Sequence, residues 1–274
     1  NDLNNIVSSI NNRASFHCED QDLLEERIDF QIPGDINSHE VWRNDEQCFK
    51  ATQRIVNIAR MNKKNIHILH VSTKQEIEFL SKNKDIASVE ITPQHLTLNA
   101  PECYNNLGSY AQMNPPIRNL THQKKLWEGI NDGTADIIGS DHAPHTKEEK
   151  DAEYPNSPSG MPGVQTLVPV MLNHVNDGKL TLNQLMNLVC ENPIKIFGIK
   201  NKGYLKEGYD ADLTIADMNK EVTIKDEMIA SKCGWTPFNN HKVKGFPVGT
   251  IVNGNLVMSD GKVIVESKGT PLKF

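Results

Sequence analysis

The sequence has no Cys-x-x-C spacing, no apolar run long enough to cross a membrane and no signal-peptide pattern at its start. Its five cysteines are scattered and odd in number, so we expect reduced, packed thiols in place of a disulfide framework or a cysteine metal site. No stretch approaches the roughly 20 apolar residues of a membrane helix, and the first residues lack the basic and apolar regions of a secretory leader. These absences favour the cytoplasm.

A block of like charge is also missing. The 29 Lys and Arg residues stand against 35 Asp and Glu residues, which gives a net charge of -6 spread along the chain. Nucleic acid and anionic membranes are therefore poor candidates as partners, and a small-molecule substrate is the better expectation. A length of 274 residues with 37% hydrophobic side chains suits one large domain, or a domain with a smaller companion.

Short β-rich runs alternate with longer segments of helical period, which is the pattern of α/β folds with a parallel sheet. The predicted strands span residues 14–18, 66–71, 87–91 and 136–140, and the predicted helices span 40–61, 74–83, 121–131, 164–176 and 182–190. Residues 143–163 are rich in Pro, Gly and Ser, and so long a loop inside a domain is usually functional. From residue 203 onward, short strands at 212–217, 248–252 and 255–258 predict a small β-rich tail, with turns at Asn253-Gly254 and Asp260-Gly261.

Three of the four predicted strands end in a residue that can bind a metal ion: His17, His70 and Asp141. The carboxyl ends of parallel strands converge on one edge of the sheet, so these side chains are expected to face a shared site. Two imidazoles and one carboxylate suit Zn²⁺, which takes neutral nitrogen and anionic oxygen ligands. A single His after an apolar run is more often structural, and it is their joint position that favours a metal site.

The run Ser140-Asp141-His142-Ala143-Pro144-His145, followed by Glu149-Lys150, resembles the signature of the dihydroorotases, a branch of the amidohydrolase superfamily. The resemblance covers essentially the whole chain. Further matches are His17-Cys18-Glu19-Asp20, His70-Val71-Ser72-Thr73, Met113-Asn114-Pro115-Pro116-Ile117-Arg118 and Gly208-Tyr209-Asp210-Ala211-Asp212-Leu213.

The resemblance implies a metal-dependent (β/α)8 barrel with a β-sandwich, and one or two Zn²⁺ ions as cofactor. It implies that His17 and His70 bind one metal, and that Asp141 binds the other and serves as general base and acid. It also implies that Asn114, His145 and the backbone at Ser159 and Gly160 hold the substrate. On the residues alone, Asn114 is equally well explained as a turn residue before two prolines, and His142 is better explained as shaping the turn.

The residue types suit the implied reaction, which is the reversible conversion of N-carbamoyl-L-aspartate to dihydroorotate plus water in pyrimidine biosynthesis. Hydrolysis of a cyclic amide at neutral pH needs an activated water, and bound Zn²⁺ lowers the pKa of water to about 7. Asp141 can take the proton of that water and deliver it to the departing ring nitrogen, provided that its surroundings tune its pKa.

The His-x-His-x-Arg motif that the family carries on its first barrel strand is absent, and so is an acidic or carboxylated-lysine bridging ligand. A full barrel takes about 250 residues. We therefore expect residues 1–202 to form the C-terminal half of the barrel, with about four strands, and residues 203–274 to belong to a small β-sandwich subdomain. Half a barrel has unpaired strand edges, so we expect a homo-oligomer or a complementing N-terminal barrel half as partner. We also expect the chain alone to be feeble or inactive as a catalyst.

Two other interpretations remain open at this point. Another cyclic amidohydrolase, such as an allantoinase or a dihydropyrimidinase, would keep the metal but need different substrate contacts. An inactive dihydroorotase-like scaffold would purify without stoichiometric zinc.

Overall fold

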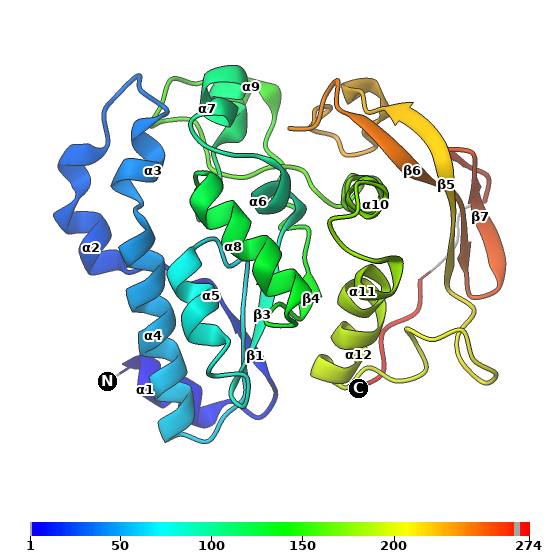
Figure 1. Cartoon of the computed structure of the whole chain (residues 1–274), viewed down its shortest axis with the longest axis horizontal. Coiled ribbons are helices and arrows are strands. Elements are labelled where there is room, and N and C mark those ends of the chain that lie inside the picture. Colours follow the sequence, from blue (N-terminus) through cyan, green and yellow to red (C-terminus); the bar gives the residue numbers. More distant parts are fainter. Residues whose placement is uncertain (1, 266–268) are drawn as a thin grey trace. The chain divides into compact units, whose positions relative to one another are not determined.

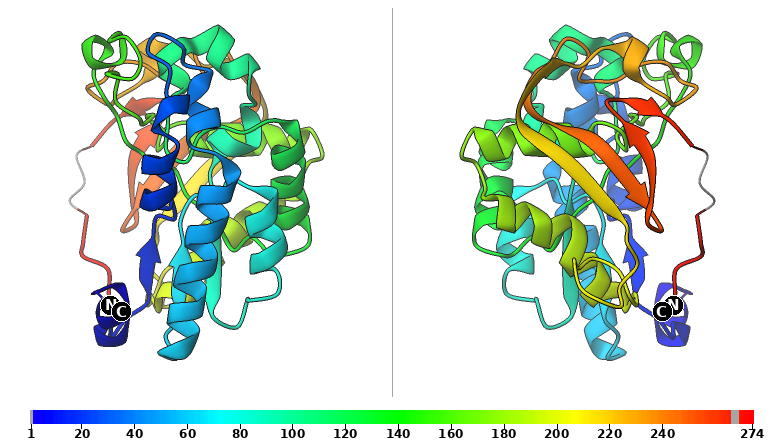
Figure 2. Two further views of the ribbon diagram at one scale, coloured as in Figure 1. Left: turned by 90° about the vertical axis from the view of Figure 1, so that its left-hand side faces the viewer. Right: turned by 90° about the vertical axis from the view of Figure 1, so that its right-hand side faces the viewer.

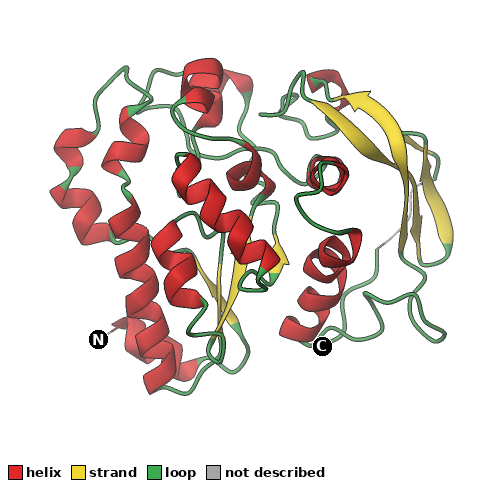
Figure 3. Cartoon of the chain, viewed as in Figure 1, coloured by secondary structure: helices red, strands yellow, loops and turns green. Residues whose placement is uncertain are grey.

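A computed structural model describes residues 2–265 and 269–274 of the chain (Figures 1 and 3). Contacts between Cα atoms divide the chain into two compact units. The first comprises Asn1–Gln165 and Asp226–Pro237, and the second comprises Thr166–Lys225 and Phe238–Phe274. The predicted boundary after residue 202 separates residues of the barrel from residues of the β-sandwich, whereas the two units are defined by their internal contacts. The predicted boundary therefore stays a prediction. Within the described residues, no helix combines the length and the apolar character that a bilayer crossing requires.

The first unit is built on a parallel sheet in which four strands lie side by side in chain order. These are β1 (Ala14–Phe16), β2 (Ile66–Ile68), β3 (Ala87–Ile91) and β4 (Ile137–Ile138). The three residues of β2 are all buried, as expected for a strand covered on both faces. The prediction of an α/β fold with four parallel strands is confirmed. Strand β3 has the predicted bounds, whereas β1, β2 and β4 are shorter than predicted, so His17 and His70 follow their strands instead of lying within them.

Helices connect the strands of this unit and cover the sheet. They are α1 (Asp2–Ser9), α2 (Gln21–Glu26), η1 (Ile28–Phe30), α3 (Ser38–Trp42), α4 (Asp45–Met61), α5 (Lys74–Leu80), α6 (Pro93–Thr97), α7 (Glu102–Leu107), η2 (Gly108–Ala111), α8 (Leu120–Asn131), α9 (Lys147–Lys150) and η4 (Asp226–Met228). Helices α4, α5 and α8 pack in sequence along one side of the unit (Figure 1). Their buried residues recur with helical spacing, as at Ile55, Val56 and Ala59 of α4, so each turns an apolar stripe to the core.

The single helix predicted over residues 40–61 is wrong, because the segment forms two helices with a break at Arg43 and Asn44. Asn44 has an extended backbone and its side chain accepts a hydrogen bond from the amide of Gln47, so it caps the start of α4. At the end of α3 the buried guanidinium of Arg118 donates to the carbonyl oxygens of Glu40, Arg43 and Asn44. These bonds satisfy carbonyls that a continuous helix would have satisfied internally.

The second unit contains a four-stranded antiparallel sheet and helices. The strands are β5 (Leu213–Thr223), β6 (Lys242–Val252), β7 (Asn255–Ser259) and β8 (Lys262–Val263), joined in that order (Figure 2). The helices are α10 (Leu167–Asn176), α11 (Leu182–Met186), the π-helical turn η3 (Asn187–Glu191) and α12 (Asn192–Phe197). Helix α10 packs on β6 so closely that a Cβ at Gly245 would lie 2.9 Å from the Cβ of Leu172.

The turns predicted in the tail are confirmed. Asn253 and Gly254 connect β6 to β7, Asp260 and Gly261 connect β7 to β8, and all four residues have positive φ. That conformation suits Asn, Asp and Gly in a tight hairpin. The strands β5 and β6 each run for 11 residues and extend well beyond the predicted ones.

Candidate functional site

The candidate metal ligands lie just beyond the carboxyl ends of the parallel strands. His17 follows β1 directly, His70 comes two residues after β2, and Asp141 comes three residues after β4. Both His70 and Asp141 have positive φ, at 35° and 41°. Residues other than glycine adopt this conformation rarely and at an energetic cost, and such strain gathers at functional sites.

The side chains of His17 and His70 face one another. Nδ1 of His17 lies 3.1 Å from Nε2 of His70, and the two rings meet edge to face at an angle of 77°. The other ring nitrogen of His17, Nε2, lies 3.0 Å from a carboxylate oxygen of Glu19. Because an ionised carboxylate only accepts hydrogen bonds, Nε2 of His17 carries the proton and the lone pair of Nδ1 points to His70.

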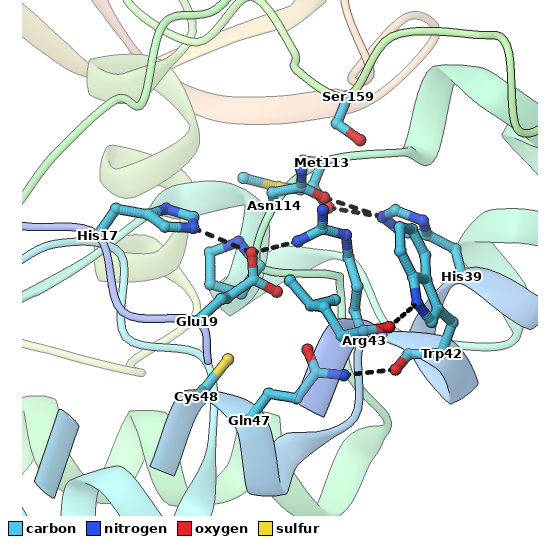
Figure 4. Close-up of polar contacts among 12 residues, drawn as sticks. His17, Glu19, His39, Trp42, Arg43, Gln47, Cys48, Met113, Asn114 and Ser159 are labelled. Atoms are coloured by element: carbon cyan, nitrogen blue, oxygen red, sulfur yellow. Dashed lines mark hydrogen bonds and ion pairs between the residues drawn. The ribbon is translucent and has the colours of Figure 1, made fainter. Parts of the chain in front are cut away.

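Glu19 is itself held by Arg43, whose Nη1 lies 2.6 Å from the same carboxylate oxygen (Figure 4). Burial raises the pKa of Glu19, but the hydrogen bond from His17 and the positive charge of Arg43 outweigh it and hold the pKa at about 2. Glu19 is therefore an anion at neutral pH, and it fixes both the tautomer and the orientation of the His17 ring. Glu19 belongs to the motif His17-Cys18-Glu19-Asp20, but the sequence alone predicts no role for it.

Asp141 lies within electrostatic reach of both imidazoles. Burial raises its pKa, the charges of His70 and His17 lower it, and the charge of Glu90 raises it. Within residues 2–265 and 269–274, no three His, Cys, Asp or Glu side chains converge closely enough to hold a metal ion. The structure therefore pairs two of the three candidate ligands and places Asp141 nearby without joining it to them.

Glu90 is a half-buried acidic residue of β3 for which the sequence predicts no role. One carboxylate oxygen accepts a hydrogen bond of 3.3 Å from the backbone amide of His70. A Cβ at Gly139 would lie 2.3 Å from the carboxylate carbon of Glu90, so the space beside β4 is shaped for this side chain. A single charged residue in the largely buried segment 87–91 is the available sequence signal.

The paired imidazoles fit a zinc ion. At Zn–N distances of about 2.0–2.1 Å, two nitrogens on one tetrahedral ion are roughly 3.3 Å apart, close to the 3.1 Å between Nδ1 of His17 and Nε2 of His70. The hydrogen bond from His17 to Glu19 is the support that metal-binding histidines usually have on their second nitrogen. The residues present therefore fit the metal, and the role of Asp141 as a third ligand stays a prediction.

The predicted substrate-binding residues of the long loop come together. Nε2 of His145 lies 3.1 Å from the carbonyl oxygen of Ser159, and the amide of Gly160 donates to the carbonyl of Gln112 at 2.9 Å. Gly160 has φ of 142°, and a Cβ there would lie 2.5 Å from the carbonyl oxygen of Ala143. Only glycine fits such a position, because both the backbone conformation and the space exclude a side chain.

Lys150 holds this loop through hydrogen bonds from its buried side chain. Its side chain is completely buried, and Nζ donates to the carbonyl oxygens of Gln112, Pro158 and Gly160 at 3.3, 2.8 and 3.3 Å. Burial lowers the pKa of Lys150 to about 7. Lys150 belongs to the motif that follows Asp141, but the sequence alone predicts no function for it.

Two further predicted residues have defined surroundings. Asn114 follows the buried Met113, and its side-chain oxygen lies 3.2 Å from Nε2 of His39. His142 shapes the turn, as expected, because its Nδ1 accepts a hydrogen bond of 3.1 Å from the amide of Gly163.

Comparisons with known proteins show the family to which the chain belongs. The profile of the Amidohydrolase family matches residues 3–257. A protein named dihydroorotase from Methanosphaera stadtmanae is 36% identical over 94% of this chain and 61% of its own length, and a dihydroorotase from Pyrococcus furiosus is 38% identical over 80% of this chain and 51% of its own length. The chain thus spans little more than half the length of the curated relatives that it matches.

Among solved structures, the L-hydantoinase (dihydropyrimidinase) from Arthrobacter aurescens superposes with a TM-score of 0.88 at 29% identity, over 92% of this chain and 58% of that one. The dihydropyrimidinase from Brevibacillus agri superposes with a TM-score of 0.85 at 23% identity, over 91% and 57% of the two chains, and shows the shared fold. These likenesses confirm the predicted fold class, a partial α/β barrel of the amidohydrolase type followed by a β segment. The chain belongs to the amidohydrolase family.

Proposed function

We propose that this chain carries the second half of the active site of a dihydroorotase, which interconverts N-carbamoyl-L-aspartate and dihydroorotate plus water. The observation that carries the proposal is the pairing of His17 and His70, 3.1 Å apart at the ends of neighbouring strands, with Asp141 beside them. Relatives that bear the name dihydroorotase and share 34–41% identity favour this substrate over those of the more distant hydantoinases.

In this proposal His17 and His70 would hold Zn²⁺. The bound ion would act as a Lewis acid toward water and the amide carbonyl. Asp141 would accept a proton from the attacking water and deliver it to the departing ring nitrogen. Its burial raises its pKa, which suits a carboxyl group that must both take and release a proton.

Asn114, His145 and the backbone of Ser159 and Gly160 would hold the substrate. His145 donates from Nε2 to the carbonyl of Ser159, and its Nδ1 lies 3.7 Å from a carboxylate oxygen of Glu149. Lys150 fixes the carbonyls of the same loop from its buried side. These bonds hold the backbone of Ser159 and Gly160 in place for the proposed substrate contacts.

A partner would complete this site. In the order β1-β2-β3-β4, the outer strands β1 and β4 each pair on one side only among the described residues. We propose that an N-terminal barrel half, in the same polypeptide or a separate one, pairs with these edges and supplies the missing arginine and the other metal ligands. A homo-oligomer and a cytoplasmic location remain predictions from the sequence.

Turnover of a substrate panel tests the proposal. The purified chain would be loaded with Zn²⁺ and mixed with dihydroorotate, dihydrouracil, hydantoin or allantoin, alone and with the N-terminal barrel half of a dihydroorotase. We expect dihydroorotate to be the preferred substrate, slow turnover by the chain alone, a large gain on complementation, and loss of turnover in Asp141→Asn. Preference for hydantoin or dihydrouracil would identify the alternative amidohydrolase, and a chain without bound zinc that stays inert after complementation would identify the scaffold.

A further inference from the structure

His39, a residue of α3, contacts the predicted substrate-binding residue Asn114 from inside the fold. The ring is 1% exposed. Its Nε2 lies 3.0 Å from the carbonyl oxygen of Met113 and 3.2 Å from Oδ1 of Asn114, and its Nδ1 lies 3.3 Å from the hydroxyl of Tyr154. Figure 4 shows the ring aimed at Met113 and Asn114.

These contacts determine which nitrogen of His39 carries the proton. A backbone carbonyl can only accept a hydrogen bond, so Nε2, which faces the carbonyl of Met113, must be the donor. Nδ1 of the neutral ring is then an acceptor, and the hydroxyl of Tyr154 donates to it. The ring stays neutral at physiological pH, because burial lowers the pKa of His39 to about 4.

The proton on Nε2 also determines how the amide of Asn114 is turned. An amide NH₂ group facing this N–H would set donor against donor, so the oxygen of Asn114 must face His39. The NH₂ group then points the other way. Nδ2 of Asn114 has no hydrogen-bond partner in the part of the chain that the structure describes, and the residue is only half-buried.

We infer that His39 is a positioning residue that orients the amide of Asn114, so that Nδ2 donates to an acceptor oxygen of the substrate. A fixed donor recognises a ring carbonyl or a carboxylate and rejects an N–H at the same place. The inference rests on the proposed function only in taking Asn114 as a substrate contact. It gives α3 a role in substrate selection, although none of its side chains needs to touch the substrate.

The first test is the ¹⁵N NMR spectrum of the purified chain, which reports the tautomer without any ligand. We expect a protonated Nε2 and an unprotonated Nδ1 in His39 across pH 6 to 8. A proton on Nδ1 would overturn the inference whatever the substrate proves to be.

The second test is binding of dihydroorotate to the zinc-loaded chain, measured by calorimetry. We expect His39→Leu to weaken binding about tenfold, since a hydrogen bond of this kind is worth on the order of a few-fold to tenfold in affinity. Asn114→Ala should weaken it by a similar factor, and the double variant by no more than either alone. His39→Gln, whose amide nitrogen can replace Nε2 as donor, should recover most of the affinity.

Tyr154→Phe is the matched control, because it removes the hydrogen bond at Nδ1 and leaves the Nε2 face intact. Its affinity should stay within about twofold of the unchanged chain. Additive effects of His39→Leu and Asn114→Ala would overturn the positioning role. Binding of hydantoin in place of dihydroorotate, with the same coupling between the two residues, would overturn the proposed function and support the role of His39. Absence of binding by every cyclic amide would overturn the recognition by Asn114.

Discussion

The buried ammonium of Lys150 makes the stability of the fold depend on pH in a defined direction. Burial lowers its pKa from 10.5 to about 7, so between pH 7 and 10.5 the folded chain holds a neutral amine while the unfolded chain holds an ammonium ion. The unfolded state binds more protons in this window, and the free energy of unfolding therefore rises with pH. The slope approaches 1.4 kcal/mol per pH unit, or about 2 to 3 kcal/mol between pH 7.5 and 9.5.

Lys150→Met removes this dependence, because methionine fills the space without a titrating group. The variant also deprives the carbonyls of Pro158 and Gly160 of their donor, which costs about 1 to 3 kcal/mol at high pH. We expect the difference in unfolding free energy between the natural chain and the variant to grow with pH by about 2 to 3 kcal/mol from pH 7.5 to 9.5. Urea denaturation at several pH values measures it. Lys147→Met, on the exposed side of the same helix, should give a curve parallel to that of the natural chain. Parallel curves for Lys150→Met would refute the reasoning.

Three other expectations follow from the site. Gly160→Ala should lower the free energy of unfolding by about 1 to 3 kcal/mol and weaken substrate binding. Gly133→Ala, also at positive φ but with free space around it, should lower the free energy of unfolding by only about 1 kcal/mol, and thermal unfolding measures both variants. Glu19→Gln should weaken zinc binding about 10- to 100-fold in a competition titration, because the support of the first ligand is lost; an unchanged affinity would remove Glu19 from that role. Cys18 and Cys48 should resist alkylation at pH 8 in the folded chain, since burial raises the pKa of both thiols, and fast labelling detected by mass spectrometry would contradict their packing.

The parts of the fold that depend on local periodicity could be predicted from the sequence. The buried strands around Ile68 and Ile91 follow from short β-rich runs between segments of helical period, and the hairpin turn at Asn253-Gly254 follows from turn chemistry. The break between α3 and α4 was missed. The residue that holds it, Arg118, lies some 75 positions along the chain, and no local pattern reveals so distant a contact.

Some residues of the candidate site could likewise be predicted from the sequence, and others could not. His17, His70 and Asp141 could be identified because each follows a predicted strand, and the sheet brings strand ends together. Glu90 and His39 could not be identified, because the partners that make them important lie on other elements. Glu90 accepts from the amide of His70, and His39 contacts the side chain of Asn114. Long-range contacts of buried polar groups are invisible to periodicity, although a polar residue inside an apolar segment marks where to look.

The most direct test of a shared metal site is the affinity of the purified chain for Zn²⁺, measured by competition with a chromophoric chelator. His17→Ala and His70→Ala should each weaken binding by at least about 100-fold, while His122→Ala, on helix α8, should leave it unchanged. Zinc affinities of the first two variants equal to that of the natural chain would contradict the assignment of these imidazoles to one ion.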